Sequence, residues 1–267
     1  MQAAGTPTPD TSSSAELSPA QDKPTESTAR KWFESAFDVS YIVTVWALVV
    51  AMARRKEHVA SEDRRTADLL RRAFTMLAIG DTAHVGFRVF AFVRGRDRSF
   101  FTWQGKRTSL IGIGEMVSSI TMTFFYVFTL DAWRVRFGKT WNWFTKLLLA
   151  SAGIRIAALA APQNEWGEEE PPQPWSTYRN VPLLTLGLGQ AYLIEKDARR
   201  TGDRTFRAIG RSMLASYAFY TPVILFARRS PLVGLLMIPK TIAYVAMAWR
   251  TYRDFYRRPR PGSGTSA

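Results

Sequence analysis

Apolar residues recur along this chain in long runs that are separated by short polar stretches. A bilayer core requires roughly 20 helical residues, with about 17 as the lower end, and six of the runs reach that length. The fifth run, VPLLTLGLGQAYLI, is shorter and glycine-rich, so six spans with one re-entrant segment is the alternative count. The pattern predicts an all-α membrane bundle of seven transmembrane helices, near residues 36–53, 73–93, 109–131, 142–161, 180–195, 208–227 and 231–249.

The two ends of the chain differ from this apolar middle. The first thirty residues are rich in Ser, Thr, Pro and Ala and contain almost no large apolar side chains, so they cannot bury enough surface to fold. No basic stretch followed by an apolar run opens the chain, which argues against a cleaved signal peptide. We expect a disordered tail over residues 1–34, a transmembrane domain over 35–253 and a disordered basic tail over 254–267.

The distribution of lysine and arginine predicts the orientation. With the N-terminus outside, the inner segments hold about twice as many basic residues as the outer ones, as the positive-inside rule requires. The acidic stretch at Glu168–Glu170 then lies outside, although the basic stretch between Arg94 and Arg107 also falls there. We therefore expect an N-out, C-in protein of the plasma or bacterial inner membrane, in contact with membrane lipids.

The formal charge of +14 also fits a nucleic-acid binder, because arginine clusters neutralise phosphates. Here the arginines stand in short clusters between apolar runs rather than on one face, which is typical of membrane-anchoring loops. Cysteine is absent, which excludes disulfides, thiolate catalysis and zinc–sulfur sites, and two histidines cannot build a three-histidine metal site. The sequence predicts no nucleic-acid partner, no metal and no cofactor.

Several ionisable side chains lie within the predicted spans, where they cost several kcal/mol and normally face the bundle interior. Asp81, His84 and Arg88 follow one another at helical spacings of three and four, so they share one helix face. With the N-terminus outside, the set lies between the membrane midplane and the outer surface, which indicates an outward-facing polar cavity. The candidate ligand-binding residues are Asp81, His84, Arg88, Glu115, Arg155, Tyr220 and Lys240.

A structural explanation competes with this one. Buried salt bridges, Asp81 with Lys240 and Glu115 with Arg155 or Arg88, would fix the packing of the helices. Replacing a buried ion pair by apolar residues is often neutral or stabilising, so stability alone poorly explains such a layer of charges.

The motifs "SSITMTFFY", "YRNVP", "FYTPV" and "MIPKTIAYV" resemble a family of uncharacterised bacterial polytopic membrane proteins over most of residues 70–250. The last two helices are also similar to microbial rhodopsins, through Tyr220, Pro222, Val223 and Lys240. That resemblance implies a retinal Schiff base at Lys240. The Arg, Asp-Trp and Thr-Thr pattern of the third rhodopsin helix is missing here, so Glu115 would have to serve as the counterion.

Three functions follow from these observations. The leading interpretation is a membrane protein that binds a small amphiphilic or lipid-derived ligand, whose anionic part would meet Lys240, Arg155 or Arg88. A metal-free lipid hydrolase is the first alternative, with Asp81 or Glu115 as general base and His84 as proton shuttle. No GxSxG, HExxH or P-loop motif accompanies it. A retinal-type Schiff-base protein or a small transporter is the second.

Overall fold

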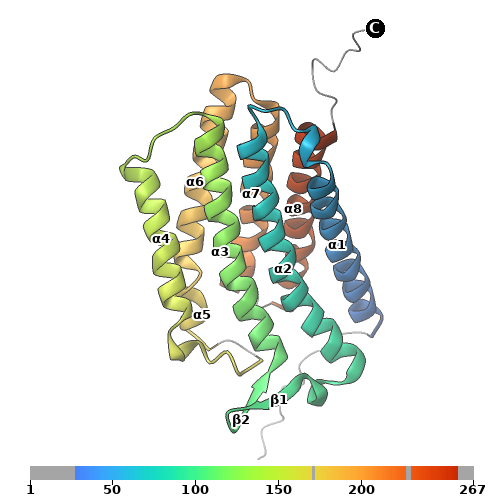
Figure 1. The fold of residues 1–267 in the computed structure, drawn as a ribbon. Helices are drawn as coiled ribbons and strands as arrows, with labels where there is room; N and C mark the ends of the chain where they lie inside the picture. Colours follow the sequence, from blue (N-terminus) through green and yellow to red (C-terminus); the bar gives the residue numbers. More distant parts are fainter. Residues whose placement is uncertain (1–27, 170–171, 227–229, 258–267) are drawn as a thin grey trace, which may run out of the picture.

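The helices of this protein run antiparallel to their neighbours in sequence, as Figure 1 shows for the computed structural model, which describes residues 28–169, 172–226 and 230–257. Within these ranges seven α-helices have 15 or more residues, and each coincides with one predicted apolar run, so the all-α fold is confirmed. They are α1 (Thr28–Arg54), α2 (Arg64–Arg94), α3 (Leu110–Arg136), α4 (Trp143–Leu159), α6 (Val181–Thr201), α7 (Arg204–Phe226) and α8 (Met237–Thr251).

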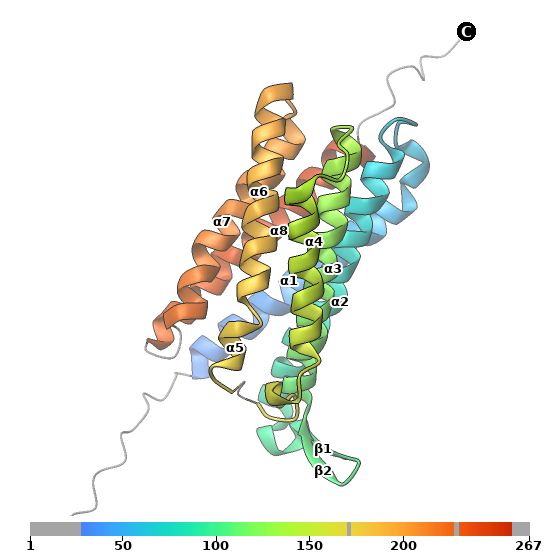
Figure 2. The ribbon, with the colours of Figure 1, turned by 90° about the vertical axis from the view of Figure 1, so that its left-hand side faces the viewer.

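Because the number of long antiparallel helices is odd, the first helix starts and the last helix finishes at opposite ends of the bundle. The first end carries the start of α1, the short helix α5 (Trp175–Tyr178) and a β-hairpin of β1 (Phe100–Trp103) and β2 (Lys106–Ser109), as Figure 2 shows (the hairpin end). The other end carries the last turn of α8 (the C-terminal end). The chain therefore enters the bundle at one end and leaves it at the other.

Four helices in the described ranges are long and apolar enough to cross a membrane, over Trp32–Arg54, Arg64–Arg94, Leu110–Arg136 and Leu232–Arg257. Helix α4 has 17 residues, and near the C-terminal end α6 contains acidic and basic residues and α7 contains basic ones. These charges lower the mean hydropathy of α6 and α7, although their lengths of 21 and 23 residues suffice for a bilayer core.

Short polar signals begin and end the helices. Asn142 and Thr145 form a reciprocal capping box at the start of α4, with a distance of 2.9 Å from the Thr145 amide to Asn142 Oδ1. Helix α6 ends at Gly202, whose φ of +72° is the left-handed conformation that glycine adopts freely. Asp203 follows and accepts hydrogen bonds from the Thr205 and Phe206 amides, both at 2.9 Å, so α7 starts at once.

Small residues bring the helices close together. A Cβ on Gly114 in α3 would lie 2.6 Å from the backbone oxygen of Ala83 in α2. A Cβ on Gly187 in α6 would lie 1.7 Å from the hydroxyl of Tyr217 in α7, which donates to the Leu183 carbonyl at 3.1 Å. Helices in membranes pack at such small residues because lipid provides little hydrophobic driving force between them.

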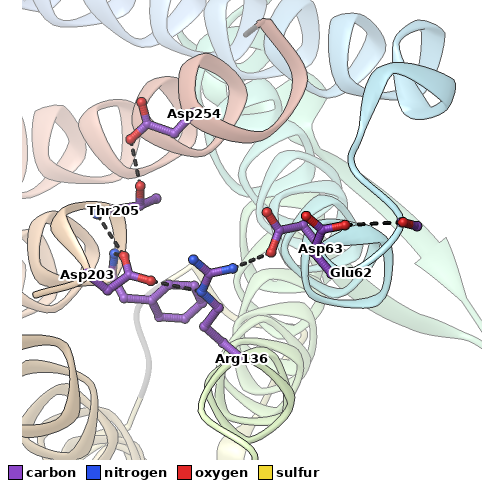
Figure 3. A network of polar contacts seen from close by, with 8 residues as sticks. Glu62, Asp63, Arg136, Asp203, Thr205 and Asp254 are labelled. Carbon is purple, nitrogen blue, oxygen red and sulfur yellow. Dashed lines mark hydrogen bonds and ion pairs between the residues drawn. The ribbon is translucent and has the colours of Figure 1, made fainter. Parts of the chain in front are cut away.

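An ionic network joins loops and helix ends at the C-terminal end of the bundle (Figure 3). Arg136, at the end of α3, forms ion pairs with Asp63 before α2 and with Asp203 before α7, the latter at 2.8 Å. Thr205 donates to Asp254 at 2.7 Å. This network connects the starts of two helices to the end of a third.

Three features differ from the sequence-based expectation. The β-hairpin was not predicted; its two-residue loop, Gln104–Gly105, has φ values of 49° and 76°, as a type I′ turn requires. Helix α1 begins at Thr28, inside the predicted N-terminal tail, and a π-helical turn continues past residue 253 to Arg257. The remaining predicted tails, 1–27 and 258–267, lie outside the described residues.

Candidate functional site

A cavity of about 520 Å³ lies in the half of the bundle nearest the hairpin end. Its walls include Glu34 near the start of α1 and Gly234 just before α8, and they extend inward to Tyr126 and Tyr244. All seven candidate residues from the sequence line this one cavity: Asp81, His84, Arg88, Glu115, Arg155, Tyr220 and Lys240. Five different helices supply them.

Asp81, halfway along α2, has a partner that the sequence did not indicate. The Tyr41 hydroxyl of α1 donates to Asp81 Oδ2 at 2.5 Å, and Tyr41 is only 7% exposed. Asp38, one turn earlier on α1, lines the cavity as well. Helix α1 thus contributes acidic and phenolic side chains to the cavity wall. The spacing of Asp38 and Tyr41 puts both on one helix face, but the sequence does not show which helix that face contacts.

Glu115, near the start of α3, forms its ion pair with Arg179, in the turn before α6. Arg179 also donates to the Asn164 side chain at 3.1 Å, and its guanidinium lies 4.3 Å from the centre of the Trp166 ring. Burial lowers the pKa of Arg179, and the adjacent Glu115 carboxylate opposes that shift. The pairing of Glu115 with Arg155 or Arg88, which the structural explanation expected, is not formed among the described residues. Arg179, from the turn before α6, pairs with the Glu115 carboxylate instead.

Arg155 of α4 is 2% exposed, and none of the described residues forms a hydrogen bond or an ion pair with it. Its Nε and Nη1 atoms are fully buried without a partner. Burying an unpaired charge costs several kcal/mol, so this guanidinium is unusual for a purely structural residue.

Lys240 of α8 lies against aromatic rings rather than against a carboxylate. Its Nζ is 4.4 Å from the centre of the Tyr220 ring and 5.7 Å from that of Tyr244. Such cation–π contacts stabilise an ammonium group by about 0.5–2 kcal/mol. Within the described ranges no ion pair joins Lys240 to Asp81, so the expected direct salt bridge is not formed. The Asp81 carboxylate accepts a hydrogen bond from Tyr41 instead.

The three candidate catalytic residues, Asp81, His84 and Glu115, line the same cavity but do not bond to one another in the described part of the chain. The buried Nδ1 of His84 has no hydrogen-bond partner there. No group of three or more His, Cys, Asp or Glu in the described ranges is placed to hold a metal ion. Both carboxylates of the trio have a partner, Tyr41 for Asp81 and Arg179 for Glu115.

A second hollow, of about 550 Å³, lies near the C-terminal end between α2, α3 and α4. Two of its arginines are paired on their own helices, Arg72 with Asp68 at 2.7 Å and Arg134 with Asp131 at 2.6 Å. The cavity at the hairpin end differs from this hollow in having a buried cation, Arg155, without a carboxylate partner among the described residues.

No protein-family model, curated protein or solved structure matches this chain. The fold and the cavity define the class instead: an all-α bundle with four helices able to cross a membrane and a polar cavity toward one end.

Proposed function

We propose that this chain is a seven-span integral membrane protein that binds a small amphiphilic or lipid-derived ligand in the cavity at the hairpin end. That end faces the outside of the plasma or inner membrane. The antiparallel course of the seven helices supports the topology, since it puts the acidic stretch at Glu168 and the arginines at Arg199–Arg200 at opposite ends. The excess of basic residues at the C-terminal end favours that end as cytoplasmic.

The observation that carries the proposal is the mixed character of the cavity wall. Charged and phenolic side chains from six helices converge on a cavity that is also lined by apolar side chains: Phe37, Val85, Met122, Leu183, Val223 and Ile238. Ligand sites are typically concave and mostly apolar, with a few convergent polar groups that orient the ligand. A ligand with one polar head and a hydrocarbon part matches both kinds of wall.

The volume is consistent with a small amphiphile, because ligand pockets commonly span about 300–1,000 Å³. The cavity is also partly formed by the segment between α7 and α8, through Gly234 and Leu235. Entry of a ligand from the outer leaflet would therefore pass the hairpin end and not the ionic network at the C-terminal end.

Filling the cavity tests the proposal. The Ser119→Trp variant adds a large ring to the cavity wall, whereas Val43→Trp adds the same ring on an exposed face of α1, where Val43 is 61% exposed. Native mass spectrometry of protein in mild detergent would measure co-purified and added amphiphiles. We expect bound ligand in the wild type and in Val43→Trp, and little in Ser119→Trp. Equal occupancy in all three proteins would remove the cavity as the binding site.

A further inference from the structure

The charges that line the cavity are unevenly compensated. Glu115 and Arg179 form an ion pair, and Arg88 lies close enough to Asp38 to act on its carboxylate electrostatically. Asp81 accepts a hydrogen bond from Tyr41. Arg155 and Lys240, like Arg88, have no carboxylate in contact among the described residues, although Asp81 is near enough to act on Lys240 electrostatically.

These two cations belong to one local environment. Arg155 projects from α4 and Lys240 from α8, and both line this cavity. Tyr220 of α7 lines it with them, and its ring centre lies 4.4 Å from the Lys240 ammonium. Two like charges in one cavity repel each other, and an anion bound near them offsets that repulsion.

Water can hydrogen-bond to a guanidinium but leaves its charge uncompensated. A carboxylate or phosphate does both, because the planar N–H groups of arginine match the spacing of two oxygens on such a group. The buried Nε and Nη1 atoms of Arg155 have no hydrogen-bond partner among the described residues, so this guanidinium has donors and a charge left for an oxyanion.

We infer that the cavity holds the anionic oxyacid head group of its ligand between Arg155 and Lys240, with Tyr220 beside it. This inference rests on the proposed amphiphile site and specifies the class of its head group. The same chemistry occurs in a fatty acid, in a phosphorylated amphiphile and in free inorganic phosphate.

Chain-matched probes separate these sources. Dodecanoate and dodecyl phosphate carry an anionic head, monododecanoylglycerol carries the same chain with a neutral head, and inorganic phosphate carries no chain. Affinities would be measured by titration calorimetry on the full chain in phosphatidylcholine nanodiscs. A hydrogen bond between charged groups contributes about 1.5–3 kcal/mol, and 1.4 kcal/mol is tenfold in affinity. We therefore expect the anionic amphiphiles to bind about 10- to 100-fold more tightly than the neutral one.

Three variants identify the residues responsible. Arg155→Met should weaken binding of the anionic amphiphiles much more than binding of monododecanoylglycerol, so that the preference disappears, and Arg155→Lys should keep part of it. Lys240→Met tests the second cation independently, and we expect it to reduce the preference for anionic amphiphiles by a smaller amount. A neutral probe that binds as tightly as the anionic ones would overturn the head-group inference but leave the amphiphile site standing. Absence of binding by every chain-bearing probe would overturn the proposed function itself, and tight binding of inorganic phosphate alone would retain the anion site without the amphiphile.

Discussion

Arg155 and Arg179 are buried to nearly the same degree, 2% and 1% exposed, yet only Arg179 contacts a carboxylate, that of Glu115. The two arginines line the same cavity. This difference gives a matched pair of substitutions whose effects on stability should have different signs.

Removing Arg179 leaves the partly buried Glu115 without its ion-pair partner, whereas removing Arg155 eliminates a charge that has no partner among the described residues. We expect Arg179→Met to lower the free energy of unfolding by about 3–5 kcal/mol, as for other broken buried pairs. Arg155→Met should leave it unchanged or raise it in ligand-free protein. Thermal and denaturant unfolding in the same detergent would compare them. Similar destabilisation by both variants would show that Arg155 has a structural partner.

Asp81 should be coupled more strongly to Tyr41 than to Lys240, because the Tyr41 hydroxyl donates a hydrogen bond to its carboxylate and no ion pair with Lys240 is formed in the described part of the chain. A double-mutant cycle of Tyr41→Phe with Asp81→Asn should give a coupling energy of about 1–3 kcal/mol. The cycle of Asp81→Asn with Lys240→Met should give less than about 1 kcal/mol. Each cycle would be read from equilibrium unfolding. A larger coupling to Lys240 would restore the direct salt bridge that the sequence suggested.

The stability that the ionic network at the C-terminal end provides should depend on pH once Arg136 is removed (Figure 3). Burial raises the pKa of Asp63 above its ordinary value, and Arg136 opposes this shift. A raised folded-state pKa means that stability is lost as the pH rises through it, so the loss is greatest without Arg136.

We therefore expect Arg136→Gln to reduce the melting temperature more at about pH 7.5 than at about pH 5. Arg134→Gln is the control, because Arg134 pairs with Asp131 on its own helix at 2.6 Å. The same pH dependence in both variants would show that the effect does not come from the Asp63 site.

Orientation can be tested with single cysteines, since the chain has none of its own. Glu168→Cys should react with a membrane-impermeant maleimide in intact cells, and Arg199→Cys should react only after the membrane is opened. Unlabelled wild type serves as the blank. Labelling of Arg199→Cys from outside would reverse the proposed N-out, C-in topology.

A retinal Schiff base at Lys240 would give a visible absorption band. The Lys240 ammonium lies 4.4 Å from the Tyr220 ring centre, and the cavity wall combines charged side chains with aromatic and aliphatic ones. We expect purified protein mixed with all-trans retinal to show no band that disappears in Lys240→Ala. Such a band would make this chain a retinal protein and displace the amphiphile proposal.

Much of the fold follows from local patterns. The lengths of the apolar runs place all seven long helices, because a helix in lipid must satisfy its backbone hydrogen bonds within one segment. The hairpin was missed because its signal, Gln104–Gly105 between short strands, is brief and lies in a basic loop. The start of α1 at Thr28 was missed because the polar turns before Trp32 have no apolar periodicity.

The sequence by itself determined that its seven candidate ligand-binding residues share one cavity, but it did not indicate the wall residues of α1 or Arg179. Ionisable residues at helical spacing within apolar runs must face the bundle interior, and seven antiparallel helices bring residues of similar depth together. Only the tertiary structure decided the partners: Glu115 with Arg179, Asp81 with Tyr41, and Arg155 with none of the described residues. Depth along each helix follows from counting residues, but the rotation of each helix and the course of the loop that carries Arg179 depend on packing between segments distant in the chain. Local pattern carries no information about those contacts.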